Sequence, residues 1–153
     1  MAIVISNIKT TPVLVPFRHP PVTASGAIGE LPLVLLDVET DVGLTGHAYL
    51  FVFLKSMLKP TMSCVAAIEE LVRGMDADPE QVDPLLRQQL RLLDIHGILG
   101  QVLAGLDMAL WDIRAKSEEL SLARVLGDPK EYVKAYNSCG LWLEKGDPEK
   151  LAD

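Results

Sequence analysis

Apolar and polar residues alternate with a period of two along three segments of the first fifty residues, which is typical of half-buried strands. These segments are residues 3–15, 33–40 and 46–51. Pro12 and Pro16 punctuate the first segment, so it is expected to be an edge strand with a break. Gly43 lies in a tight turn between the second and third segments, where a positive φ is needed. The pattern predicts a three-stranded antiparallel meander.

The stretch of residues 19–29, between the first two strands, has no period and contains two prolines and two glycines. A loop of this length is either a segment that covers a ligand or a plain surface excursion. Its apolar residues Val22 and Ile28 are unusual in a solvated connector. They favour a segment that closes over a ligand or a partner.

From about residue 54 the apolar residues recur at helical spacing. The first predicted helix ends at Gly74, and Asp78 followed by Pro79 is a cap and first-turn pair that starts a second helix, whose apolar stripe reaches Leu93. A third helix is predicted over residues 98–117. Its apolar residues cover nearly the whole circumference, so it is expected to be buried on more than one side.

The period of two returns over residues 132–140, and Asp147 with Pro148 then forms another helix start. A strand followed by a helix start is the opening of a βα unit, and a helix of barely one turn is not stable alone. We therefore expect an α+β domain over residues 1–127. Residues 128–153 are expected to be the first strand and helix start of an incomplete barrel, within a truncated chain.

Composition narrows the function classes. The chain of 153 residues is 49% hydrophobic and 23% charged, a globular mix, and its net charge of −7 argues against a nucleic-acid partner. It has no apolar run of membrane-spanning length and no basic start of a signal peptide, so a cytoplasmic protein without a membrane partner is expected. Cys64 and Cys139 match no metal spacing and are expected to be reduced thiols.

The familiar catalytic motifs are missing from the sequence: it has no glycine-rich phosphate loop and no nucleophile elbow. His47 is expected to be a hydrogen-bonded strand histidine, and Asp112 and Lys116 an ion pair across one helical turn. Asp107 lies about 140° around the helix from Asp112, so the two carboxylates should not share a metal. No catalytic and no metal-ligating residue is assigned in this chain.

Four segments together carry a resemblance to a known family. They are Thr45-Gly46-His47-Ala48-Tyr49-Leu50-Phe51, Ala104-Gly105-Leu106-Asp107-Met108-Ala109-Leu110-Trp111-Asp112-Ile113-Arg114-Ala115-Lys116, Val125-Leu126-Gly127 and Val133-Lys134-Ala135-Tyr136-Asn137-Ser138. In order and spacing they resemble the mandelate racemase and muconate lactonizing enzyme family of the enolase superfamily, nearest to its racemase branch. The resemblance covers essentially the whole chain. It implies an α+β capping domain, a three-stranded meander followed by a helical bundle, and then a (β/α) barrel that begins with the last strand of this chain.

The resemblance also implies an activity for the full-length protein. Members of the family abstract the proton α to the carboxylate of a hydroxy acid or acid sugar, as racemases or dehydratases, and stabilise the enediolate on Mg²⁺. The metal carboxylates, the Lys-x-Lys base and the His-Asp pair belong to later barrel strands, and no Lys-x-Lys occurs here. This chain would supply substrate specificity in a homo-oligomer that acts on a small carboxylate, and would be inactive alone. The alternative is a non-catalytic α+β binding or oligomerisation module.

The family's substrate contacts carry over to six positions of this sequence. They are Pro21, Val22, Thr23, Ile28, Phe53 and Ser138. The first four would form a lid over the barrel mouth, although packing within the loop itself explains Pro21 and Ile28 equally well. Phe53 stands where the racemase branch has a pocket tyrosine, which removes a hydroxyl. Ser138 matches a serine that contacts the substrate carboxylate, and its ordinary alternative is a strand-end hydroxyl.

Overall fold

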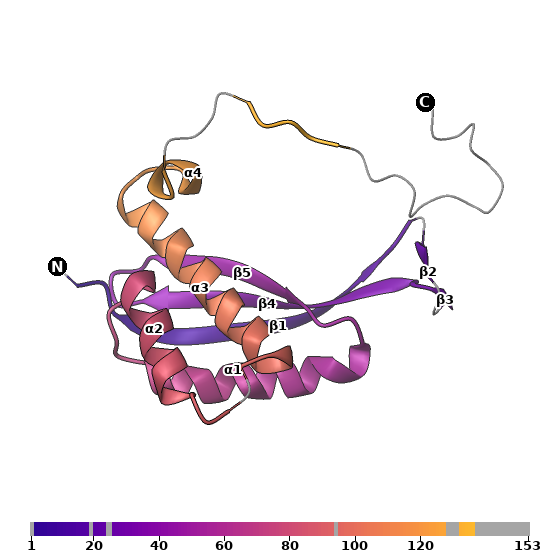
Figure 1. The fold of residues 1–153 in the computed structure, drawn as a ribbon, viewed down its shortest axis with the longest axis horizontal. Coiled ribbons are helices and arrows are strands. Elements are labelled where there is room, and N and C mark those ends of the chain that lie inside the picture. The colour runs from indigo at the N-terminus through magenta and orange to yellow at the C-terminus, as the bar shows by residue number, and fades with distance from the viewer. Residues whose placement is uncertain (1, 19, 24–25, 94, 128–131, 137–153) are drawn as a thin grey trace.

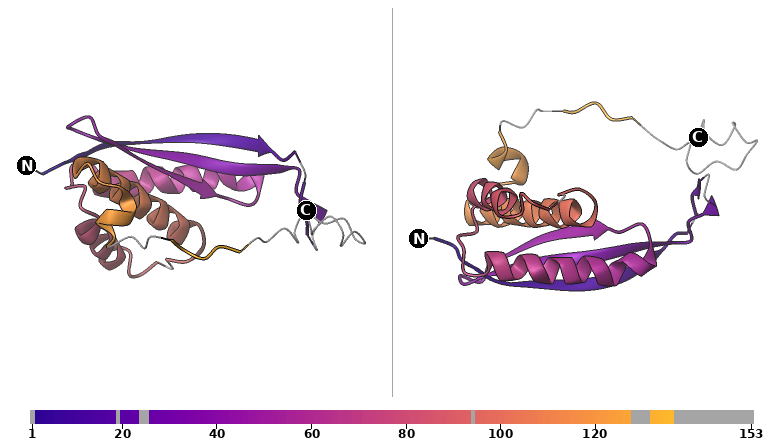
Figure 2. Two further views of the ribbon diagram at one scale, coloured as in Figure 1. Left: turned by 90° about the horizontal axis from the view of Figure 1, so that it is seen from above. Right: turned by 60° about the horizontal axis from the view of Figure 1, so that its bottom comes forward.

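A three-stranded antiparallel sheet and a layer of helices on one of its faces make up the fold (Figures 1 and 2). The computed structural model describes residues 2–18, 20–23, 26–93, 95–127 and 132–136. The sheet has the order β1-β4-β5, which confirms the predicted meander. Its strands are β1 (Ile5–Pro16), β4 (Glu30–Thr40) and β5 (Thr45–Phe51), and the short β2 (Val22–Thr23) and β3 (Gly26–Ala27) form a separate hairpin. The helices are η1 (Lys55–Met57), α1 (Leu58–Val72), α2 (Pro79–Gln89), α3 (Gly97–Ser117) and α4 (Leu122–Val125).

Alternation along the central strand decides which face of the sheet meets the helices. Val34, Leu36 and Val38 of β4 are almost fully buried, and they belong to the same core as the inward-facing residues of the helices. The intervening residues face away from the helices; Leu35, for example, is exposed. The alternation of apolar and polar residues in the sequence therefore matches the alternation of buried and exposed side chains along the strand.

Strand β1 lies at the edge of the sheet, as predicted, but neither Pro12 nor Pro16 interrupts it, so the expected break is wrong. The strand pairs with β4 without interruption from Asn7, opposite Glu39, to Pro16, opposite Glu30. A proline has no N–H to give to a ladder, and an edge strand tolerates it because half of its backbone groups face no neighbour. The irregularity in this pair lies instead between Ile5 and Asn7, where the register shifts.

The start of α2 is confirmed and its end is earlier than predicted. The Asp78 side chain accepts a hydrogen bond from the Glu80 N–H at 3.0 Å, and Pro79 occupies the first helical position. The helix ends at Gln89, and Leu93, expected on its buried stripe, is 59% exposed. An apolar residue beyond the last turn has no core to enter here, because the chain turns away towards α3.

Helix α3 packs against β5 and β4 on one side and against α1 and α2 on its flanks, which confirms burial on more than one side. Gly46 makes the close approach possible, because a Cβ there would overlap the carbonyl of Ala109. One strip of the helix stays open, with Met108 47% exposed.

The C-terminus of α3 closes in a Schellman motif. The Leu120 N–H donates to the Ala115 carbonyl and the Glu119 N–H to the Lys116 carbonyl. Glu119 has a φ of 54°, a position usually taken by glycine.

The C-terminal region is only partly described. Residues 132–136 carry no assigned strand, and Tyr132, Val133 and Tyr136 are exposed. Ser138, Cys139 and the helix start at Asp147 lie outside the described residues. The barrel strand and the domain boundary after residue 127 therefore stay predictions.

Candidate functional site

Five of the six predicted substrate contacts lie at one end of the sheet. The β2–β3 hairpin extends beyond the ends of β1 and β4 (Figure 1). It is tied at its base, because the Ile28 N–H donates to the Pro21 carbonyl at 2.9 Å and the Phe17 N–H to the Gly29 carbonyl at 3.1 Å. Pro21 and Ile28 are half-buried at this base, whereas the Val22 side chain is 64% exposed.

Phe53 follows the end of β5 in a strained conformation. Its φ is 58°, and the Leu54 N–H donates to the Val52 carbonyl at 2.6 Å, which closes a three-residue turn centred on Phe53. A bulky side chain in the left-handed region costs about 1–3 kcal/mol, and such strain gathers at functional sites. The ring is nevertheless 66% exposed, with its centroid 4.0 Å from that of Phe51. The structure thus holds an aromatic surface rigidly at a position where it gains little from burial.

The hairpin and the Phe53 turn belong to the same end of the sheet. Glu30, which starts β4 directly after the hairpin, lies 3.9 Å from the ammonium of Lys55 in η1. The Val52 N–H donates to the carbonyl of Pro32 near the start of β4. These contacts place Pro21, Val22, Ile28 and Phe53 on two loops of one edge of the domain. Thr23 lies in β2 of the same hairpin, and Ser138 lies outside the described residues.

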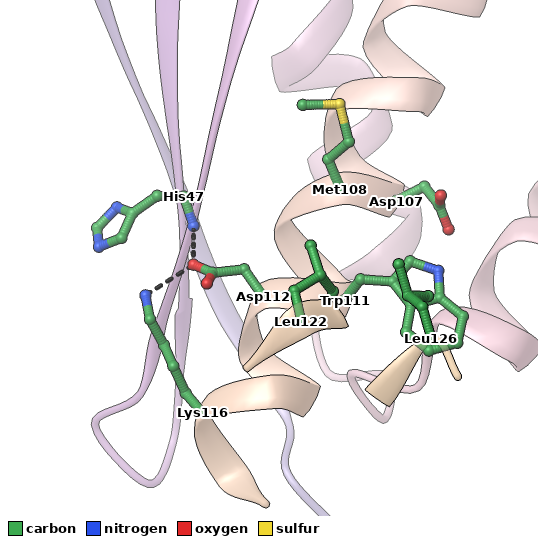
Figure 3. Close-up of a pocket in the computed structure, with 8 residues that line it drawn as sticks. All are labelled: His47, Asp107, Met108, Trp111, Asp112, Lys116, Leu122 and Leu126. Carbon is green, nitrogen blue, oxygen red and sulfur yellow. Dashed lines mark hydrogen bonds and ion pairs between the residues drawn. The ribbon is translucent and has the colours of Figure 1, made fainter. Parts of the chain in front are cut away.

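A second feature lies away from these loops. A pocket of about 580 Å³ opens between α3, α4 and β5 (Figure 3). Its lining residues are His47, Asp107, Met108, Trp111, Asp112, Lys116, Leu122 and Leu126. Helix α4 lies at the opposite end of the molecule from the β2–β3 hairpin (Figure 1). The pocket is therefore separate from the predicted substrate contacts.

The polar residues on one side of this pocket hold α3 to the outer edge of β5. The Asp112 carboxylate accepts a hydrogen bond from the His47 N–H at 2.8 Å and an ion-pair contact from the Lys116 ammonium at 2.7 Å. Lys116 also donates to the carbonyl of Thr45, and Gln101 donates to the carbonyl of Phe51. Edge groups that would otherwise be open to another strand are thus occupied by α3 side chains. The predicted Asp112–Lys116 pair is confirmed.

The environment of Asp112 lowers its pKa on balance. Partial desolvation raises the pKa, but the hydrogen bonds from Lys116 and from the His47 backbone, with the nearby charges, outweigh it. The imidazole of His47 turns to β4, where its Nδ1 lies 2.8 Å from Asp37. This confirms the hydrogen-bonded strand histidine.

Asp107 faces the other way, towards α2. Desolvation and the nearby charge of Asp83 raise its pKa, and a hydrogen bond with Trp111 and the charge of Arg87 offset part of that rise. Asp107 and Asp112 point apart in Figure 3, as their spacing on the helix predicts. Within the described part of the chain, no three His, Cys, Asp or Glu residues are grouped so that they could hold a metal ion. The residues described here do not form a magnesium site.

The family is decided by the sequence profile that the chain matches. Residues 5–127 match the family described as mandelate racemase / muconate lactonizing enzyme, N-terminal domain. The chain belongs to this family. The matched region contains β1 to α4, so the α+β fold described above is the family's N-terminal capping domain.

Two curated relatives of the chain are named as dehydratases. An arabinonate dehydratase of Saccharolobus solfataricus is 31% identical over 80% of this chain and 33% of its own length. An L-talarate/galactarate dehydratase of Salmonella typhimurium is 33% identical over 74% of this chain and 29% of its own length. This chain therefore spans about a third of the length of these curated relatives.

One solved structure with the same fold contains a bound ligand. An enolase from Bradyrhizobium, crystallised with magnesium and mandelic acid, is 33% identical, with a TM-score of 0.78 over 82% of this chain and 35% of that one.

None of the helices among the described residues has the length and apolar character needed to cross a membrane.

Sequence analysis did not identify some residues of the loop end of the sheet and of the pocket beside α3. Leu54, next to Phe53, is 62% exposed. The sequence pattern that could have identified it is an apolar run that continues past the end of β5. Leu122 begins α4 and Leu126 directly follows its last residue, and this helix is too short to show a helical period. They reach the pocket only because the chain reverses after α3.

Proposed function

We propose that this chain is the substrate-specificity part of a magnesium-dependent enzyme of the mandelate racemase type. The full-length protein would abstract the proton α to the carboxylate of a hydroxy acid or acid sugar, as a racemase or dehydratase. The observation that carries this proposal is the family match over residues 5–127. Its dehydratase relatives and the magnesium-bound Bradyrhizobium enolase support it.

In this proposal the two loops at the end of the sheet form a lid over the substrate. Pro21, Val22, Thr23 and Ile28 would cover it from the hairpin, and Phe53 from the neighbouring turn. The gathering of these loops at one edge of the domain, and the strain at Phe53, support that role. Closure of such a lid keeps bulk water from the reacting carbon and fixes the orientation of the substrate. Ser138 would donate a hydrogen bond from its hydroxyl to the substrate carboxylate.

The proposal divides the chemistry between two parts of the full-length protein. A carbon acid next to a carboxylate ionises only with strong electrostatic stabilisation of the oxyanion that forms, which magnesium supplies when bound. Because the described residues form no metal site, the ligands would come from the barrel. We therefore expect the 153-residue chain alone to be inactive.

Exchange of the α-proton in D₂O, followed by proton NMR, tests the proposal. The full-length protein with magnesium should exchange the α-proton of at least one member of a panel that contains both apolar hydroxy acids and acid sugars. The 153-residue chain should exchange none under the same conditions. Absence of exchange by the full-length protein with every carboxylate would overturn the proposed reaction, and exchange by the short chain would overturn the division of roles.

A second candidate, a non-catalytic binding or oligomerisation module, is favoured by the open pocket beside α3. Met108, Leu122 and Leu126 leave apolar surface there, which is a common mark of an interaction site. Sedimentation of the full-length protein would distinguish the two: self-association without α-proton exchange favours the module. A homo-oligomeric enzyme in the cytoplasm remains our prediction.

A further inference from the structure

The face of the sheet that points away from the helices carries eight uncharged side chains in three rows. The helices of the described residues cover the other face (Figure 2). The strand register brings side chains of this outer face side by side across the sheet. From the middle of the sheet towards the β2–β3 hairpin, the rows are Thr11, Leu35 and Tyr49; Val13, Leu33 and Phe51; and Val15 and Leu31. We call these eight residues the outer patch.

The outer patch is open to solvent in this domain. Tyr49 is 59% exposed, Val15 44% and Leu35 38%, and Leu33 and Phe51 are only half-buried. Large apolar side chains that gather on one exposed face mark an interaction surface. Tyrosine is enriched in such surfaces, because its ring buries a large area and its hydroxyl keeps a polar contact. The outer patch therefore has the character of a protein–protein contact.

Charged side chains lie beyond both ends of the outer patch. In the next row away from the hairpin, Asp37 lies between Lys9 and His47, and its carboxylate is 2.8 Å from His47 Nδ1. One row further, Glu39 accepts a hydrogen bond from the Asn7 side chain. At the hairpin end the charged residues outside the rows are Arg18, Glu30 and Lys55. Because the net charge of the chain is −7, two copies repel each other over much of their surface, and the uncharged patch is where they can meet.

The outer patch is complementary in shape to a second copy of itself. Strand β5 carries the large rings of Tyr49 and Phe51, whereas β1 carries the small β-branched side chains of Val13 and Val15. A two-fold axis that runs along β4 between two stacked sheets lays β5 of one copy over β1 of the other. Large side chains then meet small ones, and Leu35 meets its own copy near the axis. Side chains of stacked sheets interdigitate in this way.

The size of the face and the path of the chain both fit a second copy. From strand rise and spacing, the outer face measures roughly 35 by 14 Å, about 500 Å² in projection. That is a large share of the about 800 Å² that each partner buries in a stable interface. Helix α4 packs on α3, and residues 132–136 lie on the helical side of the sheet (Figure 2). The part of the full-length protein that follows residue 127 therefore begins on the opposite side of the sheet from the outer patch.

We propose that the outer face of the sheet is a two-fold interface with a second copy of this chain, with the axis along β4. The outer patch forms the dry centre of this interface, and the rows that contain Asp37 and Glu39 form part of its polar rim. The interface does not depend on the proposed reaction, since none of its eight central residues belongs to the predicted substrate contacts.

Sedimentation equilibrium of the full-length protein tests the interface with a matched pair of variants. Leu35→Lys brings two ammonium groups together near the axis, and Leu71→Lys makes the same change on α1. Leu35 is 38% exposed and Leu71 40%, and both variants change the net charge equally. Leu35→Lys should raise the Kd of self-association at least about 100-fold, and Leu71→Lys should leave it unchanged. A monomeric parent protein at micromolar concentration, or equal Kd values for the two folded variants, would overturn the proposal.

Cross-linking tests the direction of the axis without a change of charge, and it remains decisive if Leu35→Lys does not fold. Thr11→Cys and Tyr49→Cys are made as separate full-length variants without the native cysteines, mixed, diluted to exchange subunits and reconcentrated. Thr11 of one copy should lie over Tyr49 of the other, so a bis-maleimide of about 10 Å span, the spacing of stacked sheets, should join them. The mixture should give severalfold more cross-linked dimer than either variant alone. No excess in the mixture would overturn the proposal and show that another part of the protein, or another partner, covers this face.

Discussion

Asp112 joins α3 to the edge of β5, and its removal should cost more than the loss of an ordinary helix ion pair. Asp112→Ala removes the acceptor of the His47 N–H and the partner of Lys116. A hydrogen bond to a charged group contributes about 1.5 kcal/mol, taken at the low end because the carboxylate is about a third exposed. The exposed pair adds about 0.3–0.5 kcal/mol, and alanine returns about 0.5 kcal/mol of helix propensity. The net loss should be about 1.5 kcal/mol.

Asp83 on α2 provides the matched control. Its carboxylate is 30% exposed against 31% for Asp112, and each contacts a cation one turn later at 2.7 Å. Two features differ: Asp112 accepts a hydrogen bond from a strand N–H, and the charge of Asp83 lies near that of Asp107. Asp83→Ala should therefore cost about 0 kcal/mol or be slightly stabilising, because the loss of the pair and the gain in helix propensity nearly cancel and the repulsion with Asp107 is relieved.

The measurement is urea denaturation followed by tryptophan fluorescence at pH 7 and pH 3. The pKa of Asp112 is lowered in the folded protein, so its contribution is complete above the ordinary carboxyl pKa of about 4 and is lost as the pH falls through the folded value. The gap between Asp112→Ala and the parent protein should therefore shrink at pH 3. Equal losses for the two variants at pH 7, or a gap that does not change with pH, would refute the reasoning.

Three further substitutions probe packing, backbone strain and burial of charge, each by the same denaturation assay. Gly46→Ala should destabilise the protein by about 3 kcal/mol or prevent folding, because the new methyl overlaps the carbonyl of Ala109; a loss under 1 kcal/mol would contradict the close approach of β5 and α3. Glu119→Gly should stabilise it by about 1 kcal/mol, because glycine adopts the φ of 54° without strain; a loss would show that the side chain makes a compensating contact. Asp107→Asn should raise the free energy of unfolding at pH 7, because desolvation and the charge of Asp83 raise the pKa of Asp107 and disfavour its ionised form. That gain should disappear near pH 3, where aspartate is already protonated, and a gain that persists there would have another cause.

The sheet and the long helices were open to prediction because their burial is periodic. Val34, Leu36 and Val38 alternate in the sequence as they do in the core, and the cap at Asp78 depends only on its neighbours. The continuity of β1 through Pro12 was not open to prediction in the same way. The cost of a proline depends on which side of the strand has a neighbour, and only the assembled sheet decides that.

The candidate site could likewise be predicted only in part from the sequence. Sequence reasoning assigns the lid residues by resemblance, and the structure adds that the hairpin and Phe53 share one end of the sheet. The left-handed backbone of Phe53 could not be foreseen, because aromatic residues rarely adopt it. The pocket could not be foreseen either, since Trp111 and Leu126 meet only through the packing of α4 on α3.

The two borders of the sheet are protected by different means. Along β1, Pro12 and Pro16 offer no amide hydrogen to an incoming strand, and along β5 the side chains of Gln101, Asp112 and Lys116 already occupy backbone groups. Such edge strands disfavour intermolecular strand pairing through backbone hydrogen bonds while the chains fold in a crowded cell. Any larger assembly built on this domain has to grow from its surfaces and loop ends, which leaves the three-stranded meander as a fixed unit.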